Sequence, residues 1–228
     1  MTAVPPAPWG ARVGFVVGLA AEARLLSPLP CPVAIGGGTP AGARAAAERL
    51  AAEGATALVS FGLAGGLDPA LPAGTLLVPV AVFSRGIRLA ADPALAAGLG
   101  GVTRQALVAT EEIVATPTAK ARLWRETGCA GVDLESGAVA EVARDRGVPF
   151  AVLRAICDPG MRGLPPAALA ALDPEGSIAI GRVLAALARH PGQIFALLAL
   201  AREAAAARQA LAARVAALAG REEWRRRG

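Results

Sequence analysis

The segment at residues 131–159 alternates between helical and extended patterns, and it constrains the fold more than any other part of the chain. Val139 and Val142 recur at helical spacing with a charged residue between them. This pattern predicts a helix with one buried face that ends at Gly147. Residues 150–156 form an almost unbroken apolar run, as in a parallel strand covered on both faces. Such a strand needs helices on both sides of its sheet, so the segment predicts an α/β fold.

Two acidic residues follow strands of this segment. Glu135 comes just after a short predicted strand at 130–132, and Asp158 comes just after the strand at 150–156. Ligands of open α/β sheets bind at the carboxyl ends of the strands, so both carboxylates are expected to face one crevice. Each acid also has a purely structural explanation. A glutamate in a first helical turn is favoured by the helix dipole, and an aspartate before proline commonly forms a turn.

The rest of the chain continues the alternation of strands and helices, which argues for an α/β sandwich with a largely parallel sheet. We predict one domain over residues 1–228, with 191–228 forming a C-terminal helix and a basic tail. The other strands are expected at 12–18, 33–35, 57–61, 76–83 and 106–109, and the other helices at 43–52, 118–127, 178–188 and 193–218.

Two glycine-rich segments stand at strand ends. Residues 36–38 precede Thr39 and Pro40, a good helix start, and a helix N-terminus with free N–H groups suits an anion. Residues 62–67 contain three glycines and would let the backbone approach a ligand closely. A third acid, Glu22, follows the first strand. Each feature alone is weak evidence, but together they favour a functional site at the strand ends.

Composition limits the chemistry that such a site can use. The 54% hydrophobic content of 228 residues is enough to bury the core of one domain. The three cysteines show neither paired nor metal-like spacing, so no disulfide framework and no metal are expected, and a reducing cytoplasm fits. The single histidine, His190, precedes a proline and is more typical of a capping or solvent role. Acidic side chains must therefore carry any proton transfer.

The net charge of +5 does not indicate a nucleic-acid partner, because such binding calls for a basic stripe with aromatic platforms, whereas aromatic residues make up only 4% of the chain and tyrosine is absent. The basic C-terminus favours a solvated tail, with contact to an anionic membrane surface as the second interpretation. The helix at 193–218 is expected to pack on the sheet or on another subunit; the alternative is contact with a membrane or a lipid substrate. We expect a cytoplasmic homo-oligomer, with the inner face of the membrane as the alternative location.

Several motifs in order along the chain resemble the purine nucleoside phosphorylase and methylthioadenosine/adenosylhomocysteine nucleosidase superfamily. They are GFVVGLAAEARLL at 14–26, the glycine segments 36–38 and 62–67, VDLES at 132–136 and RAICD at 154–158. The resemblance implies a single-domain three-layer α/β/α sandwich with a mixed, largely parallel central sheet. Residues 158–169 and 184–193 look like the hopanoid-associated phosphorylase subgroup, which is thought to remove adenine from adenosylhopane.

The resemblance implies an enzyme that cleaves the N-glycosidic bond of a purine nucleoside and releases adenine. Asp158 would place a proton on N7 of the leaving purine, a role that requires a raised pKa. Glu135 would accept hydrogen bonds from the ribose hydroxyls and favour the developing cation. Glu22 would activate water if the reaction is a hydrolysis. No cofactor is implied beyond inorganic phosphate or water as cosubstrate.

The other implied contacts concern the base, the sugar and the nucleophile. Leu134 stands where the family has a methionine against the sugar, while Ile113 and Val114 fall in the base pocket without the family's aromatic ring. The candidates for contacts to the nucleophile or to phosphate are Gly38, Gly62, Leu63, Ala64, Arg24 and Arg44. Phosphorolysis and hydrolysis both stay open, as do adenosylhopane and methylthioadenosine or adenosylhomocysteine as substrates. A non-catalytic protein that binds a nucleoside or a lipid is the alternative from another class.

Overall fold

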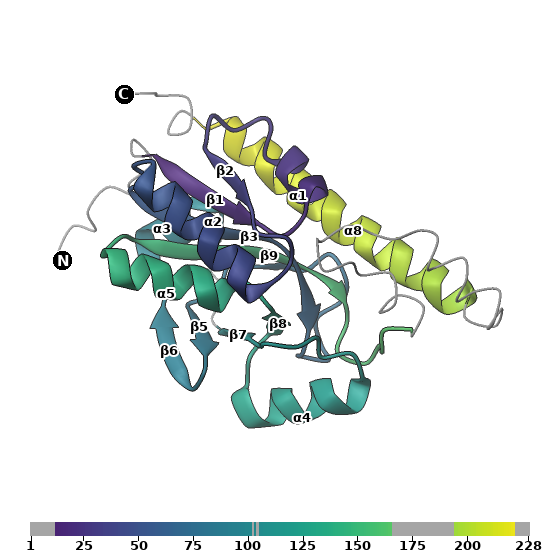
Figure 1. The fold of residues 1–228 in the computed structure, drawn as a ribbon. Coiled ribbons are helices and arrows are strands. Elements are labelled where there is room, and N and C mark those ends of the chain that lie inside the picture. Colours follow the sequence, from purple (N-terminus) through teal and green to yellow (C-terminus); the bar gives the residue numbers. More distant parts are fainter. Residues whose placement is uncertain (1–11, 102, 104, 166–193, 222–228) are drawn as a thin grey trace, which may run out of the picture.

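The computed structural model describes residues 12–101, 103, 105–165 and 194–221. The described strands form one sheet in the order β2-β1-β3-β8-β7-β5-β6, with β9 paired to β3 and to β4 (Figure 1). The strands are β1 (Val13–Val17), β2 (Val33–Ile35), β3 (Ala57–Gly66), β4 (Leu76–Leu77), β5 (Ala81–Ser84), β6 (Ile87–Ala90), β7 (Leu107–Ala109), β8 (Gly131–Asp133) and β9 (Phe150–Asp158).

The sheet contains two groups of parallel strands that run in opposite directions, and β4 and β6 pair antiparallel with β9 and β5. Strands β1, β2, β3 and β9 are parallel to one another, and so are β5, β7 and β8. The groups meet at β3 and β8, which are antiparallel, with Gly65 opposite Val132. Gly131, the first residue of β8, therefore lies opposite Gly66, the last residue of β3. A mixed, largely parallel sheet, as the sequence and its resemblance indicate, is confirmed.

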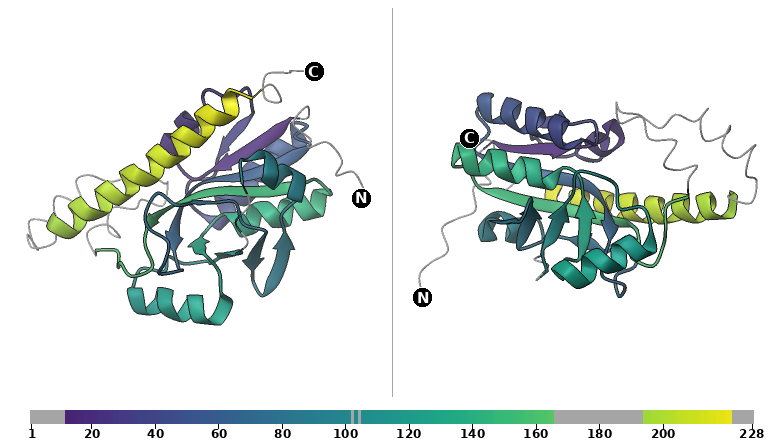
Figure 2. Two further views of the ribbon diagram at one scale, coloured as in Figure 1. Left: turned by 180° about the vertical axis from the view of Figure 1, so that it is seen from behind. Right: turned by 60° about the horizontal axis from the view of Figure 1, so that its bottom comes forward.

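Helices cover both faces of this sheet (Figures 1 and 2). The described helices are α1 (Ala20–Leu25), α2 (Pro40–Ala52), α3 (Pro93–Gly98), α4 (Pro117–Thr127), α5 (Ser136–Arg146) and α8 (Ile194–Ala219). Leu50 of α2 and Val139 of α5 belong to the buried cluster on one face. Leu95 of α3 and Leu211 of α8 belong to the cluster on the other face. These three layers are the α/β/α sandwich expected from the resemblance.

Local sequence signals fix the ends of several helices. Helices α2 and α4 both begin with threonine followed by proline. The Thr39 hydroxyl accepts a hydrogen bond from the Gly42 N–H at 3.1 Å, and the Thr116 hydroxyl accepts one from the Ala119 N–H at 3.2 Å. Helix α5 ends at Gly147, which adopts a left-handed conformation with φ of 67°. These boundaries follow from capping chemistry that is visible in the sequence.

Strand β3 is longer than the sequence predicts. The sequence indicates a strand over 57–61 followed by a glycine loop at 62–67, whereas β3 continues to Gly66. It does so because its last residues pair with β9 on one side and with β8 on the other. Strand β9 likewise continues through Asp158, which is its last residue rather than the residue after it. The second glycine segment is therefore part of the central sheet.

Other differences lie toward the edges of the sheet. The strand expected at 76–83 is interrupted at Pro79, which bridges to Thr103, so that it forms β4 and β5 separately. Strand β6 and helix α3 have no counterpart among the predicted elements. The helix expected at 178–188 and the tail at 222–228 lie outside the described residues.

Helix α8 packs on the sheet only through its C-terminal half. Its fully buried residues, Ala207, Leu211, Val215 and Leu218, recur at helical spacing on one face. Its N-terminal half extends past the sheet (Figures 1 and 2), and Phe195 there is 79% exposed. Among the residues that the structure describes, none of the helices is both long and apolar enough to cross a membrane.

Candidate active site

A cavity of about 720 Å³ opens where the two parallel groups of strands meet. Glu22, Glu135 and Asp158 all line it, although they are far apart in the sequence. The sequence predicts that Glu135 and Asp158 meet because parallel strands end at one edge. In the structure β8 and β9 belong to opposite groups, and the acids meet across the reversal between β3 and β8. The shared cavity is correctly predicted, but the topological reason for it is not.

Glu22 lies in α1, directly after β1, and is 4% exposed. Its Oε2 accepts hydrogen bonds from the N–H groups of Gly18 at 2.9 Å and Leu19 at 3.0 Å. Its Oε1 accepts a hydrogen bond from the Leu63 N–H at 2.9 Å. Three backbone donors from two segments therefore hold this carboxylate in one orientation at the wall of the cavity.

Gly62 makes room for two charged side chains. Its φ of 149° lies in a region that side chains rarely adopt. A Cβ at this position would lie 2.6 Å from Nη1 of Arg154 and would also collide with the Glu22 carboxylate. Gly62 itself is not among the residues that line the cavity. Gly62 thus allows two side chains of the protein to approach closely, while Gly65 of the same segment lines the cavity.

A buried ion network surrounds Arg154, which is 1% exposed in the middle of the sheet. Its Nη2 lies 2.8 Å from Oδ2 of Asp133 and 3.0 Å from Oε2 of Glu135. The same nitrogen donates a hydrogen bond to the Ser60 hydroxyl at 2.8 Å. Burial alone would lower the pKa of Arg154, but the neighbouring acids raise it above its ordinary value. Nη2 of the guanidinium thus has several partners within the protein, whereas its Nε is buried and makes no hydrogen bond.

Glu135 retains one free acceptor atom in this network. Its Oε1 is buried and has no hydrogen-bond partner, and a Cβ at Gly18 would come within 2.8 Å of it. Burial raises the pKa of Glu135 to about 7, and the charges of Glu22 and Asp133 act in the same direction, whereas Arg154 opposes the shift. A buried acceptor without a partner is costly unless a ligand supplies the missing donor.

Asp158 faces a lysine across the end of β9. The ammonium of Lys120, in α4, forms a close ion pair with Oδ2 of Asp158 and is itself fully buried. The Cys157 thiol donates to Oδ1 of Asp158 at 3.3 Å. Burial raises the pKa of Asp158 from its ordinary value, and Lys120 works against that rise. Asp158 is therefore a partly desolvated acid beside a fixed positive charge.

Most of the other candidate residues line the same cavity. Leu134 lies between Asp133 and Glu135 in the wall, and Ile113 and Val114 lie in the segment that follows β7. Leu63 and Ala64 contribute the end of β3 to the wall, and Gly38 contributes the turn before α2. The wall is thus largely apolar between the acids.

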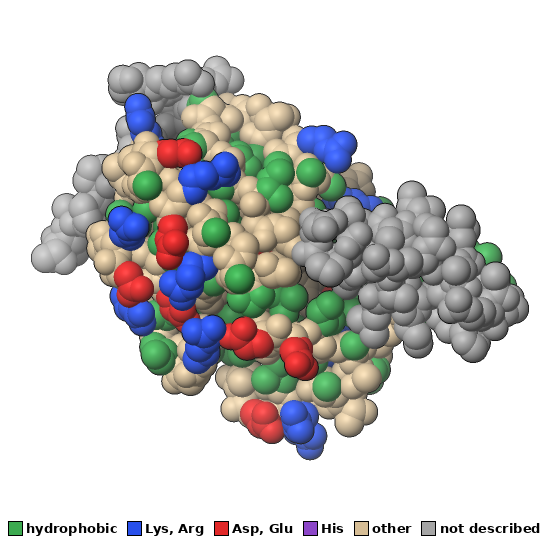
Figure 3. Space-filling view, viewed as in Figure 1, with side chains coloured by type: hydrophobic (Ala, Val, Ile, Leu, Met, Phe, Trp, Pro, Cys, Tyr) green, Lys and Arg blue, Asp and Glu red, His purple; other side chains and the backbone are tan. Residues whose placement is uncertain are grey.

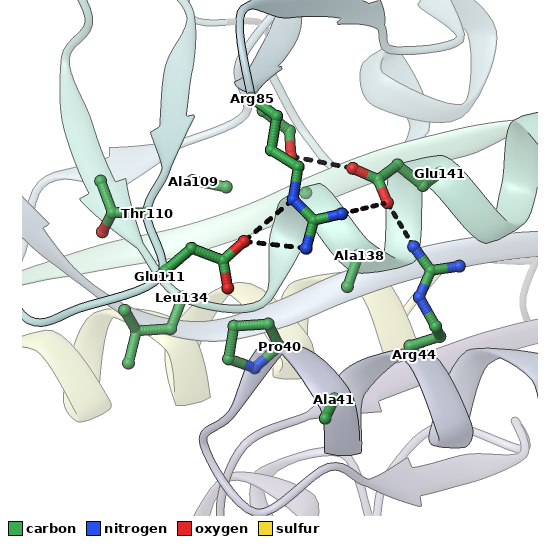
Figure 4. A pocket seen from close by; sticks show the side chains of 12 residues that line it. Pro40, Ala41, Arg44, Arg85, Ala109, Thr110, Glu111, Leu134, Ala138 and Glu141 are labelled. Atoms are coloured by element: carbon green, nitrogen blue, oxygen red, sulfur yellow. Dashed lines mark hydrogen bonds and ion pairs between the residues drawn. The ribbon is translucent and has the colours of Figure 1, made fainter.

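The structure does not bring Arg24 and Arg44 to this cavity, contrary to the expectation from their positions in the sequence. Arg24 is exposed and donates to the Ala20 carbonyl of its own helix at 3.3 Å. Arg44 lines a second cavity of about 240 Å³, where it forms an ion pair with Glu141 (Figure 4). Arg85 also points toward Glu141 there and lies 2.9 Å from Glu111. Acidic and basic side chains interleave on the surface nearby (Figure 3).

Acidic side chains therefore predominate among the charged residues that line the main cavity. Among the described residues that line it, Arg154 is the one cation, and it is already paired. The acids that line it are Glu22, Glu111, Glu112, Asp133, Glu135 and Asp158.

Three contributors were not singled out by the sequence: Asp133, Arg154 and Lys120. Asp133 and Arg154 stand inside VDLES and RAICD, so their presence in motifs was the available signal. For Lys120 the available signal was different: it is the sole lysine of the chain, and it lies in a predicted helix.

Comparisons with known proteins agree with this fold. The sequence model of the phosphorylase superfamily matches residues 29–189. A methylthioadenosine/adenosylhomocysteine nucleosidase from Helicobacter pylori superposes with a TM-score of 0.65 at 16% identity, covering 91% of this chain and 99% of that chain. An adenosylhomocysteine nucleosidase from Streptococcus pyogenes gives 0.61 at 16%, covering 70% and 86%. A futalosine hydrolase from Helicobacter pylori gives 0.58 at 18%, covering 64% and 87%. No curated protein matches the chain significantly.

The fold and the cavity define a class of nucleoside-cleaving enzymes, and the chain belongs to the phosphorylase superfamily. The prediction of a nucleoside phosphorylase or nucleosidase is confirmed at this level, because the family model covers most of the chain. The nucleosidases above share its fold at low sequence identity.

Proposed function

We propose that this protein hydrolyses the N-glycosidic bond of an adenine nucleoside, with water as the nucleophile. The observation that carries the proposal is the convergence of Glu22, Glu135 and Asp158 on one acidic cavity. Bond cleavage passes through a ribosyl cation while the base leaves with the bonding electrons. Acidic side chains suit both needs, since one can protonate the base and the others can stabilise the cation.

Asp158 is proposed as the acid that protonates N7 of the purine. It is 5% exposed, and burial raises the pKa of its carboxyl, which is the direction that a general acid requires. Glu135 is proposed to bind the ribose hydroxyls. Its partnerless Oε1 supplies an acceptor, and its other oxygen is held by Arg154 at 3.0 Å.

Water is favoured over phosphate by the charge and the donors of the cavity. A phosphate dianion needs cations and free backbone N–H groups. The N–H groups of Gly18, Leu19 and Leu63 instead donate to the Glu22 carboxylate. Glu22 is thus a candidate for the base that activates water. Among the described lining residues acids also outnumber the one cation, Arg154, and this balance disfavours a phosphate dianion.

For the 5′-substituent, we propose an apolar group, and adenosylhopane is the specific candidate. The apolar lining, which includes Leu63, Ile113 and Leu164, supports an apolar group. The resemblance of residues 158–169 and 184–193 to the hopanoid-associated subgroup supports adenosylhopane, although residues 166–193 lie outside the described part. Methylthioadenosine is the competing substrate, since a structurally similar nucleosidase from Helicobacter pylori holds 5′-methylthioadenosine in its active site.

The test incubates purified protein with adenosines that differ at the 5′ position, with and without phosphate. We expect adenine and a free sugar at a rate that does not depend on phosphate; a sugar 1-phosphate would contradict hydrolysis. Asp158→Asn should lower turnover about 10²–10⁴-fold while nucleoside binding persists. The exposed Asp145, in α5, offers a matched Asp145→Asn control that should leave turnover unchanged. A protein that binds nucleosides without releasing adenine would be the non-catalytic alternative.

A further inference from the structure

Lys120 has an environment that is unusual for a lysine. It is fully buried, and it is the sole lysine of the chain. Besides the Asp158 carboxylate, its ammonium donates toward three backbone carbonyls: Asp158 at 3.1 Å, Pro159 at 3.4 Å and Arg162 at 3.1 Å. All four neighbours are oxygen acceptors, so the cage fits a charged ammonium and leaves no donor for a neutral amine.

This cage fixes the position of Asp158 relative to the cavity. Lys120 reaches it from α4, while the carboxylate belongs to the last residue of β9. Among the described residues the other titratable neighbour in contact is Cys157, from β9 itself, and Gly65 of β3 lies beside the carboxylate, where a Cβ would come within 3.3 Å of Oδ1. Glu22 and Glu135 line the same cavity from α1 and the start of α5. Lys120 is therefore the one cation that contacts Asp158 among the described residues.

We propose that Lys120 is a positioning residue that orients Asp158 and stabilises the carboxylate left after Asp158 has given its proton to the leaving base. The inference rests on the proposed function. The Asp158 O–H bond breaks as the N7–H bond forms, and the electrons of the glycosidic bond move into the purine. Water attacks the sugar and gives its proton to Glu22, and exchange with solvent restores both acids.

Lys120 has a second effect on the same step. Burial raises the pKa of Asp158, and the largest opposing influence is the charge of Lys120. Without that charge Asp158 would hold its proton too tightly to be an effective acid. Removing Lys120 should therefore extend activity to higher pH while it lowers the maximal rate.

The test compares the pH profiles of Lys120→Met and of the parent enzyme acting on its best 5′-substituted adenosine. We expect the alkaline limb to move up by about one pH unit or more, and kcat to fall about 10-fold or more, with KM changed less. The control is Arg122→Met, which removes a cation from the exposed side of the same helix and should leave the profile unchanged. A loss of activity with an unmoved limb would indicate a structural role and overturn the proposal.

A second measurement does not require Lys120→Met to fold. Because the chain has one lysine, ¹⁵N-lysine labelling gives a single ammonium resonance that needs no assignment. In the intact protein this resonance should shift as Asp158 titrates, and the shift should vanish in Asp158→Asn. If the chemical shift of this resonance stays constant while Asp158 titrates, the proposed coupling is refuted. If no nucleoside is cleaved but the coupled titration is seen, the proposed function fails while the Lys120–Asp158 pair stands.

Discussion

Glu135→Gln should stabilise the protein at alkaline pH and not at acidic pH. Burial raises the pKa of Glu135 from 4.5 to about 7. A raised carboxyl pKa means that the folded state holds a proton that the unfolded state has released. The stabilising contribution of protonated Glu135 is complete below the pKa of the unfolded state and is lost as the pH rises through the pKa of the folded state. Glutamine does not titrate, so the variant escapes this loss.

The expected size follows from the two pKa values. Between about pH 5 and about pH 8, ionisation of Glu135 should lower the free energy of unfolding of the parent by about 2.5 kcal/mol relative to that of the variant. The side chain is only 7% exposed, so solvent screens the effect little. Groups that do not interact with Glu135 occur in both proteins and cancel in the comparison, and the influence of Glu22, Asp133 and Arg154 is already contained in the shifted pKa of Glu135.

The measurement is urea unfolding of both proteins at each pH, with free energies extrapolated to water. Glu48→Gln, on the exposed side of α2, makes the same chemical change at the surface and should follow the parent at both pH values. If Glu135→Gln and the parent change in parallel within about 0.5 kcal/mol, Glu135 ionises as an ordinary carboxyl and the reasoning fails.

Three further substitutions probe the structure. Gly62→Ala should lower kcat/KM about 10²-fold by displacing Glu22 and Arg154, whereas Gly38→Ala, where a Cβ meets nothing within 4 Å, should have a smaller effect in the same assay. Arg154→Met should lower the free energy of unfolding by about 3–5 kcal/mol, because it leaves buried acids without their cation; Arg122→Met should change it by less than about 1 kcal/mol. Leu211→Ala should lower the free energy of unfolding by about 2–5 kcal/mol, because Leu211 is buried against the sheet. Leu198 is 49% exposed in the N-terminal half of α8, so Leu198→Ala should cost less, and equal effects of the two substitutions would contradict the packing described.

Local signals in the sequence predict several elements well. The helix start at Thr39 and the helix end at Gly147 depend on the chemistry of single residues, and β2 and α5 lie where the sequence indicates. The end of β3 could not be predicted in this way. Glycines 62, 65 and 66 favour a loop locally, and only pairing with two neighbouring strands makes them part of the sheet.

The candidate site likewise has a part that the sequence could predict and a part that it could not. The residue types of the three acids and of the apolar wall could be selected from motifs and strand ends. The places of the cations could not, because proximity in sequence to a glycine segment does not say where a long side chain points. Arg44 pairs with Glu141 in another cavity, while Lys120, from a helix with no glycine motif, reaches Asp158.

The sequence by itself determined the class of fold and the three acids, because apolar periodicity and short motifs are properties of contiguous residues. Tertiary structure alone decided the reversal of strand direction between β3 and β8, across which Glu22, Glu135 and Asp158 line one cavity. It also decided the burial and the partners that shift the pKa values of Glu135 and Asp158. Desolvation and charge pairing depend on distances in space between segments that the chain order leaves far apart.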